Sequence, residues 1–356
     1  MALDTSNLVE LTMAICDIES VSGNEAALAD EVEALLTKCA HLSVVRDGNA
    51  IVASTNLNRS SRVVIAGHID TVPVANNLPT QLHHFEREQV IVGRGTVDMK
   101  GGVAVMLKLA VELQDPNVDI SWVFYDNEEV ASELNGLGRL VRNRPDLIQG
   151  DFAVLCEPTS ALIEGGCNGT IRIEVTASGK KAHSARPWMG ENAIHKLAPA
   201  LEKLASFQPE TLTVDGLEYR ESLNAVLASA GIATNVIPDL ATLTVNYRFA
   251  PSRSGEEAER LMREFFADYE VTVTDLAVGA RPGLNTEPAQ AFMASLGTEV
   301  KPKYGWTDVA RFSALGIPAV NYGPGDPSLA HADNENVTVG HLFDCEAGLR
   351  RWLSGN

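Results

Sequence analysis

The chain has 356 residues, a formal net charge of −19 at pH 7, 45% hydrophobic residues and 21% charged residues. This length exceeds the usual size of a single hydrophobic core, so two domains are expected. The composition excludes a disordered or repetitive protein. The acidity excludes a nucleic-acid-binding surface, which would need clustered Lys and Arg.

No run of 18 apolar residues occurs, and the first 20 residues lack the basic start of a secretory signal. We therefore expect a cytoplasmic protein without a membrane span. The five cysteines form no Cys-x-x-Cys pair and fall mostly in apolar runs, which predicts free thiols in a reducing compartment.

In the first half of the chain, short apolar runs alternate with helical patterns. The apolar spacing predicts helices over 5–17, 24–38, 101–113 and 133–142, and strands over 62–68, 90–95, 120–126 and 151–157. This alternation indicates an α/β domain with a largely parallel sheet.

The pattern changes from about residue 170. Strands are predicted over 171–177, 223–231, 242–249 and 270–276, with helices over 191–206 and 254–269, the latter capped by Ser254. This β-α-β-β-α-β order is the ferredoxin-like split arrangement. The α/β pattern then resumes with a helix over 307–315, a strand over 317–323 and a helix over 338–353. We thus expect a catalytic domain of mixed sheet and flanking helices (1–169 and 278–356) with an inserted α+β domain (170–277).

Several acids and a histidine follow predicted strands, where open α/β sheets bind ligands. His68 and Asp70 lie two positions apart and point to the same side. Asp98 stands between glycine-rich turns and a helix, and Glu128 and Glu129 follow the strand over 120–126. Each has an ordinary alternative: a loop hydrogen bond, a helix cap or a solvated acidic turn.

Glu157 ends another apolar strand, and His331 lies in a loop rich in Gly and Pro. One histidine and three carboxylates at the exits of successive strands of one sheet can converge. Together with His331 they suit two divalent ions that share a carboxylate, with zinc favoured by nitrogen and oxygen ligands. The nucleotide-binding order G-x-x-x-x-G-K-[ST] and the serine-hydrolase elbow G-x-S-x-G are both missing. The other histidines are predicted to be surface residues, except His183 in a glycine-flanked loop of the inserted domain.

Read in order, these motifs resemble those of the M20 family of metallopeptidases and deacylases over essentially the whole chain. The family's motifs H-x-D, G-x-x-D-M-K-G, E-E, E-P and a late His correspond to His68-Ile69-Asp70, Gly95 to Gly101, Glu128-Glu129, Glu157-Pro158 and His331. The resemblance implies a zinc-peptidase-like fold with a lid and dimerisation domain.

The resemblance also implies a role for each residue. Asp98 would bridge the two metals, zinc or alternatively cobalt. His68 with Glu157 would complete one site, and Glu129 with His331 the other. Asp70 would orient His68, and Glu128 would act as the general base. His183 would reach the active site of the partner subunit in a homodimer and polarise the scissile carbonyl.

Several segments look closest to the desuccinylase branch of the family, which implies hydrolysis of N-succinyl-LL-2,6-diaminopimelate to succinate and LL-2,6-diaminopimelate in lysine biosynthesis. Residues expected to contact this small anionic N-acyl amino acid are Thr170, Arg186, Asn235, Arg248 and Arg311. The alternatives are another M20 deacylase, such as an acetylornithine deacetylase or aminoacylase, a non-catalytic metal-binding scaffold, and a nucleotide-binding protein.

Overall fold

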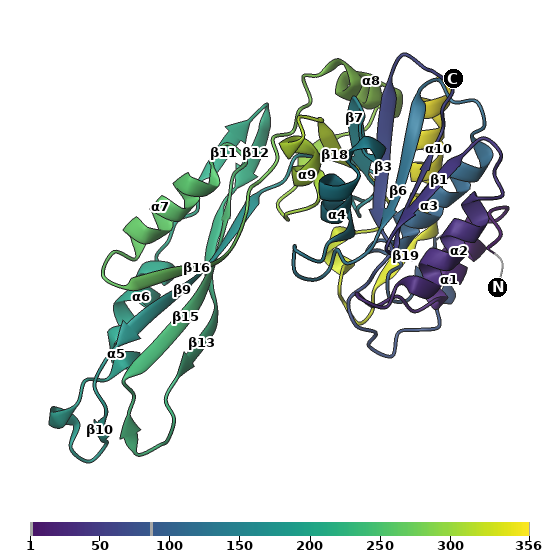
Figure 1. Ribbon diagram of the computed structural model, residues 1–356. Coiled ribbons are helices and arrows are strands. Elements are labelled where there is room, and N and C mark those ends of the chain that lie inside the picture. The colour runs from purple at the N-terminus through teal and green to yellow at the C-terminus, as the bar shows by residue number, and fades with distance from the viewer. Residues whose placement is uncertain (1–2, 86–87, 356) are drawn as a thin grey trace. The chain divides into compact units, whose positions relative to one another are not determined.

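The computed structural model describes residues 3–85 and 88–355, which form two compact units (Figure 1). The first unit comprises Met1–Gly165, Gly283–Lys301 and Arg311–Asn356, and the second Gly166–Pro282 and Pro302–Ala310. The second unit therefore extends a few residues beyond the predicted 170–277 on each side. It also takes in residues 302–310, which were expected in the catalytic domain.

The first unit is built around an eight-stranded mixed sheet, as expected, in the order β1-β2-β6-β3-β7-β18-β8-β17. The strands are β1 (Ser43–Asp47), β2 (Ala50–Ser54), β6 (Asp119–Tyr125), β3 (Arg62–His68), β7 (Phe152–Leu155), β18 (Ala319–Asn321), β8 (Ile163–Gly165) and β17 (Val300–Pro302). The central strands β6, β3, β7 and β18 are parallel, whereas β2 and β8 pair with them in the antiparallel direction. The carboxyl ends of the four parallel strands thus share one edge of the sheet.

Helices cover this sheet, with α1, α2, α3 and α10 on one side in Figure 1 and α4 and α9 on the other. The helices are α1 (Leu8–Asp17), α2 (Ala26–Leu36), α3 (Lys100–Glu112), α4 (Gly136–Asn143), α8 (Glu287–Leu296), α9 (Val309–Ala314) and α10 (Val339–Ser354), with short 3-10 turns at Pro145–Leu147 and Pro327–Leu329. The central helix α3 is almost entirely buried. Among the described residues, no helix combines the length and apolar character needed to cross a membrane.

One predicted strand belongs elsewhere. The run over 90–95 was expected in the large sheet, but β5 (Glu88–Val92) lies in a separate sheet in the order β19-β5-β4, with β4 (Gln81–Phe85) and β19 (Asn336–Thr338). The expectation that all the acids leave one sheet was therefore wrong for Asp98. This residue lies in the glycine-rich connection between β5 and α3.

The second unit has the expected β-α-β-β-α-β order and an antiparallel sheet in the order β13-β15-β9-β16. Its elements are β9 (Gly169–Ser178), β10 (Ala182–His183), a 3-10 turn (Pro187–Met189), α5 (Ala193–Lys196), α6 (Ala198–Ala205), β11 (Thr211–Val214), β12 (Leu217–Arg220), β13 (Ser222–Ala230), β14 (Val236–Ile237), β15 (Leu240–Phe249), α7 (Gly255–Phe265) and β16 (Glu270–Ala277). The single helix predicted over 191–206 is split in two, with Pro199 at the start of α6. Ser254 caps α7 as predicted, because its side chain accepts from the amide of Glu257 at 3.1 Å.

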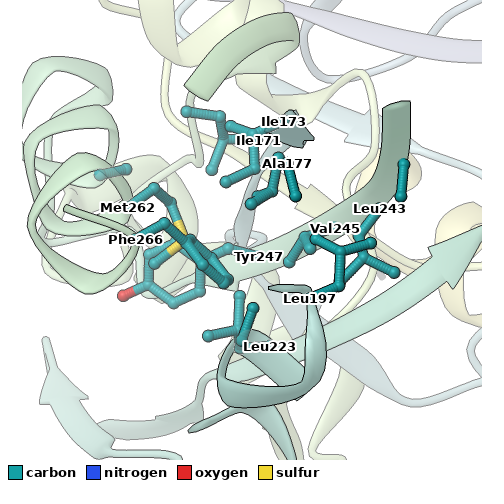
Figure 2. Packing of buried hydrophobic residues seen from close by; sticks show 14 of the residues in the cluster. Ile171, Ile173, Ala177, Leu197, Leu223, Leu243, Val245, Tyr247, Met262 and Phe266 are labelled. Carbon is teal, nitrogen blue, oxygen red and sulfur yellow. The ribbon is translucent and has the colours of Figure 1, made fainter. Parts of the chain in front are cut away.

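The core of this unit follows from strand alternation. Every second residue of β9 and β15 is buried, and Figure 2 shows Ile171, Ile173, Val245 and Tyr247 in one cluster with Phe266 after α7. The residues between them lie on the opposite face of the sheet. That second face carries the polar side chains of the two strands.

Candidate metal centre

His68 ends β3 and has a side chain that is only 1% exposed. Its Nδ1 lies 3.0 Å from the backbone oxygen of Asp70 and 3.3 Å from Asp70 Oδ1, and its Nε2 lies 3.1 Å from Asp98 Oδ1. A proton on Nδ1 that is donated to Asp70 leaves the lone pair of Nε2 for a ligand, as in many metal sites. The buried histidine is thus held from one side and open to Asp98 on the other.

Asp98 lies between two histidines. Its Oδ1 faces His68, and its Oδ2 lies 3.3 Å from Nε2 of His331, which is also 2.9 Å from Glu129 Oε1. One potential ligand atom each from His68, Asp98 and Glu129 lies within 4.8 Å of the others. A carboxylate with a histidine at each oxygen suits a bridge between two cations.

The charges of these residues depend on one another. Burial acts to lower the pKa of His68, but hydrogen bonds with Asp70 and Asp98 outweigh it and raise the pKa well above the ordinary value. Hydrogen bonds with Asp98 and Glu129 raise the pKa of His331 to about 10. Burial acts to raise the pKa of Asp98, yet the two histidines hold it well below its usual range. The acids therefore create a strongly negative centre, which favours bound cations.

Asp70 also holds the loop that carries the paired glutamates. The amides of Glu128 and Glu129 donate to its Oδ1 and Oδ2 at 3.0 and 3.1 Å, and the hydroxyl of Ser22 donates to Oδ2 at 2.7 Å. Burial acts to raise the pKa of Asp70, but His68 and these donors hold it below its ordinary value. One buried carboxylate thus fixes both a histidine and the neighbouring acidic turn.

A second buried carboxylate, Glu335, was not singled out from the sequence. Its Oε1 accepts from the amides of Val97 and Asp98 at 2.9 and 3.1 Å, and its Oε2 lies 2.7 Å from Nη1 of Arg94. It follows His331 by four positions in the same loop. Glu335 therefore ties the loop of one histidine to the loop of Asp98.

Glu157 follows β7 at the same edge of the large sheet and is 6% exposed. Its position after a parallel strand agrees with the expectation for the carboxylate of the first metal site. Its role as a ligand remains a prediction, as do the roles assigned to the other residues of this centre.

The predicted substrate residues fall into separate groups. In the second unit, Arg248 Nε donates to Asn246 Oδ1 at 3.0 Å, and Asn246 Nδ2 donates to Thr170 Oγ1 at 2.9 Å. Burial and the nearby Arg172 lower the pKa of Arg248. Asn246 was missed, although strand alternation places it on the same face as Arg248.

At another place in this unit, β10 pairs with β14 and brings His183 beside Asn235, whose backbone oxygen accepts from the amide of Ser184 at 3.0 Å. Arg186 lies in the same exposed loop, and its amide donates to the backbone oxygen of His183. Arg311 belongs to the first unit, where its Nη2 donates to Ser132 Oγ at 3.0 Å.

Comparison with known proteins identifies the family. Residues 64–354 match the model of peptidase family M20/M25/M40. The chain belongs to this family. It is 51% identical over 350 residues to a proposed succinyl-diaminopimelate desuccinylase, DapE, of Mycobacterium tuberculosis, with 98% of each chain covered. It is 44% identical over 357 residues to the succinyl-diaminopimelate desuccinylase of Corynebacterium glutamicum, with 97% of this chain and 96% of the relative covered.

Two solved structures share the fold. A tripeptidase of Staphylococcus aureus superposes with a TM-score of 0.79 at 21% identity, over 99% of both chains. The Bacillus subtilis protein YXEP, described as a dinuclear metal-binding peptidase of the M20 family, gives a TM-score of 0.68 at 15% identity, over 98% of this chain and 97% of that one. These similarities confirm the predicted fold.

Proposed function

We propose that this M20 protein hydrolyses N-succinyl-LL-2,6-diaminopimelate to succinate and LL-2,6-diaminopimelate with two divalent metal ions. We propose zinc as the metal, with cobalt as the alternative. The observation that carries the proposal is the convergence of His68, Asp98, Glu129 and His331 in a chain that is 51% and 44% identical to desuccinylases over nearly its whole length. Two imidazoles and several carboxylates are a donor set that fits zinc.

The chain's own residues would divide the reaction between them. His68, Asp98, Glu129, Glu157 and His331 would hold divalent ions, which would lower the pKa of a water and polarise the amide carbonyl. Glu128 takes a proton from the attacking water and passes it to the leaving amine. Asp70 fixes His68 and, through two amide hydrogen bonds, the turn of Glu128 and Glu129. We assign to His183 the polarisation of the scissile carbonyl.

The second unit offers groups for an anionic substrate and a surface for a partner. Arg248 is a half-buried guanidinium beside Asn246 and Thr170, which suits a carboxylate of the substrate. The edge strand β13 exposes Val226 and Leu227 at 52% and 68%, which supports homodimerisation through this unit by strand and side-chain contacts. Five free cysteines support a reducing, cytoplasmic location.

The substrate is tested by release of free amine from N-succinyl-LL-2,6-diaminopimelate and, in parallel, from N-acetylornithine. Preference for the succinyl substrate is the expected result. Turnover of the acetyl substrate alone would contradict the desuccinylase assignment and favour another deacylase of the family.

The base is tested by Glu128→Gln. The variant should lose turnover and still bind metal, because Glu128 is assigned no ligand role. Unchanged activity would remove Glu128 from the mechanism.

A further inference from the structure

The segment between α1 and α2 lies directly beside the metal centre. Val21 forms a parallel bridge with Thr71, and the amide of Ser22 donates to the backbone oxygen of Thr71 at 3.1 Å. The hydroxyl of Ser20 donates to the backbone oxygen of Ile69 at 2.7 Å. The residues that follow are therefore anchored against the loop that carries Asp70.

Glu25, at the start of α2, turns its carboxylate into this region and is completely buried. Its Oε1 accepts from the backbone amides of Gly23 at 2.7 Å and Asn127 at 3.3 Å, and its Oε2 accepts from Asn49 Nδ2 at 3.3 Å. All three donors are uncharged. In these contacts the side chain serves as a hydrogen-bond acceptor for N–H groups and not as the partner of a cation.

The turn that Glu25 reaches is the one that carries the base. Asn127 has a left-handed backbone with φ of 58°, and the next two amides, those of Glu128 and Glu129, donate to Asp70. Three successive amides thus end on two buried carboxylates. Asp70 fixes the turn from the side of His68, and Glu25 fixes its first residue from the side of α2.

We propose that Glu25 is a positioning residue of the hydrolase. By accepting the Asn127 amide, it sets the backbone from which Glu128 reaches the water and Glu129 reaches the metal. The inference rests on the proposed roles of these two glutamates. It assigns Glu25 no contact with substrate.

The hydrogen-bond geometry distinguishes the reach of the side chain from its charge. In Glu25→Gln the carboxamide oxygen can still accept both backbone amides, while its NH2 replaces Oε2 and needs an acceptor at Asn49. Asn49 already accepts from Arg46 Nη2 at 3.3 Å, so Asn49→Asp supplies acceptors for both neighbours. Glu25→Asp keeps the charge but withdraws the oxygens by about one C–C bond, ~1.5 Å, which breaks the contact with Asn127.

The test compares these variants on N-succinyl-LL-2,6-diaminopimelate, with Glu10→Gln on the exposed side of α1 as the control. With metal in excess, Glu25→Asp should lower kcat about 10- to 100-fold, the usual cost of losing such a support, with KM unchanged. Glu25→Gln should lower kcat by a smaller factor, and the double variant Glu25→Gln/Asn49→Asp should recover part of that activity. A larger loss in Glu25→Gln than in Glu25→Asp, or unchanged kcat in both, would overturn the proposal.

Hydrogen exchange gives a readout that is independent of substrate. The amides of Asn127 to Glu129 should exchange faster in metal-loaded Glu25→Asp than in the wild type, while those of β3 stay protected. If the wild type does not hydrolyse the succinyl substrate, the proposed function fails, but this measurement still decides the role of Glu25. If Glu25→Asp does not fold, Glu25→Gln decides: faster exchange of the Asn127 amide that Asn49→Asp slows again supports the proposal, and exchange unchanged from the wild type contradicts it.

Discussion

Removal of the Glu335 side chain should damage both the fold and the metal centre. Glu335 is fully buried, accepts the amides of Val97 and Asp98, and pairs with Arg94, whose side chain is 4% exposed. In Glu335→Ala the guanidinium stays buried without its partner and the two amides lose their acceptor. Removing one member of a buried ion pair costs about 3–5 kcal/mol in unfolding free energy.

A second variant separates charge from hydrogen bonding. Glu335→Gln combined with Arg94→Met keeps an oxygen for the two amides and leaves no unpaired charge, so it should lose less stability than Glu335→Ala. Because the amide of Asp98 is one of those released, metal affinity in Glu335→Ala should fall about 10- to 100-fold.

Urea unfolding of chelator-treated protein measures the first effect, and metal titration the second. Chelation is needed because weaker metal binding alone would lower the stability of the loaded protein. If Glu335→Ala unfolds within about 1 kcal/mol of the wild type, the net contribution of a single ordinary hydrogen bond, and binds metal as tightly, then Glu335 does not hold the Asp98 loop.

Three further predictions concern packing, pH and assembly. A Cβ on Gly102 would lie 2.2 Å from a backbone carbonyl oxygen at the end of β7, so Gly102→Ala should lower the melting temperature, whereas Gly340→Ala, with its nearest neighbour at 3.7 Å, should leave it unchanged or raise it. Burial acts to raise the pKa of Asp119, but two backbone amides and a threonine hydroxyl hold it below the ordinary value. Its stabilisation is therefore present above the unfolded-state value of about 4 and lost as the pH falls through the folded-state value. The wild type should exceed Asp119→Asn in unfolding free energy by about 1.5–3 kcal/mol at pH 7, and this difference should decrease on acidification. A difference that does not change with pH would contradict this. If His183 acts in the partner's site, mixing equal amounts of inactive His183→Ala and inactive Glu128→Gln should restore roughly a quarter of wild-type turnover. About half of the twofold dimers are then mixed, and each mixed dimer has one intact site. No recovery in verified mixed dimers would show that His183 does not act in the partner's site.

Much of the fold follows from local sequence patterns. The apolar run over 62–68 is β3 with the same limits, and the amphipathic pattern over 254–269 contains α7. The hairpin of β1 and β2 was missed, although Asp47-Gly48 between two short apolar runs is a local turn signal. The run over 90–95 was placed in the wrong sheet, since an apolar strand carries no signal that names its neighbour.

The candidate centre was predictable to a different degree. His68 and Glu129 follow parallel strands, so their proximity could be expected from topology alone. Glu25 and Glu335 could not be found in this way, because their hydrogen-bond donors lie far away in the chain. Glu25 accepts from an amide 102 positions away, and Glu335 accepts from amides 237 and 238 positions away. From the sequence alone, a buried glutamate that accepts hydrogen bonds from backbone amides cannot be distinguished from an acid on a solvated surface.

The central claim is tested most directly by titrating zinc into chelator-treated protein while hydrolysis of N-succinyl-LL-2,6-diaminopimelate is followed. The account predicts no turnover without metal, and turnover that rises with zinc and stops rising once about two ions are bound per chain, as in other two-metal hydrolases. Turnover that is independent of metal, or a fully loaded protein that leaves this amide intact, would contradict it.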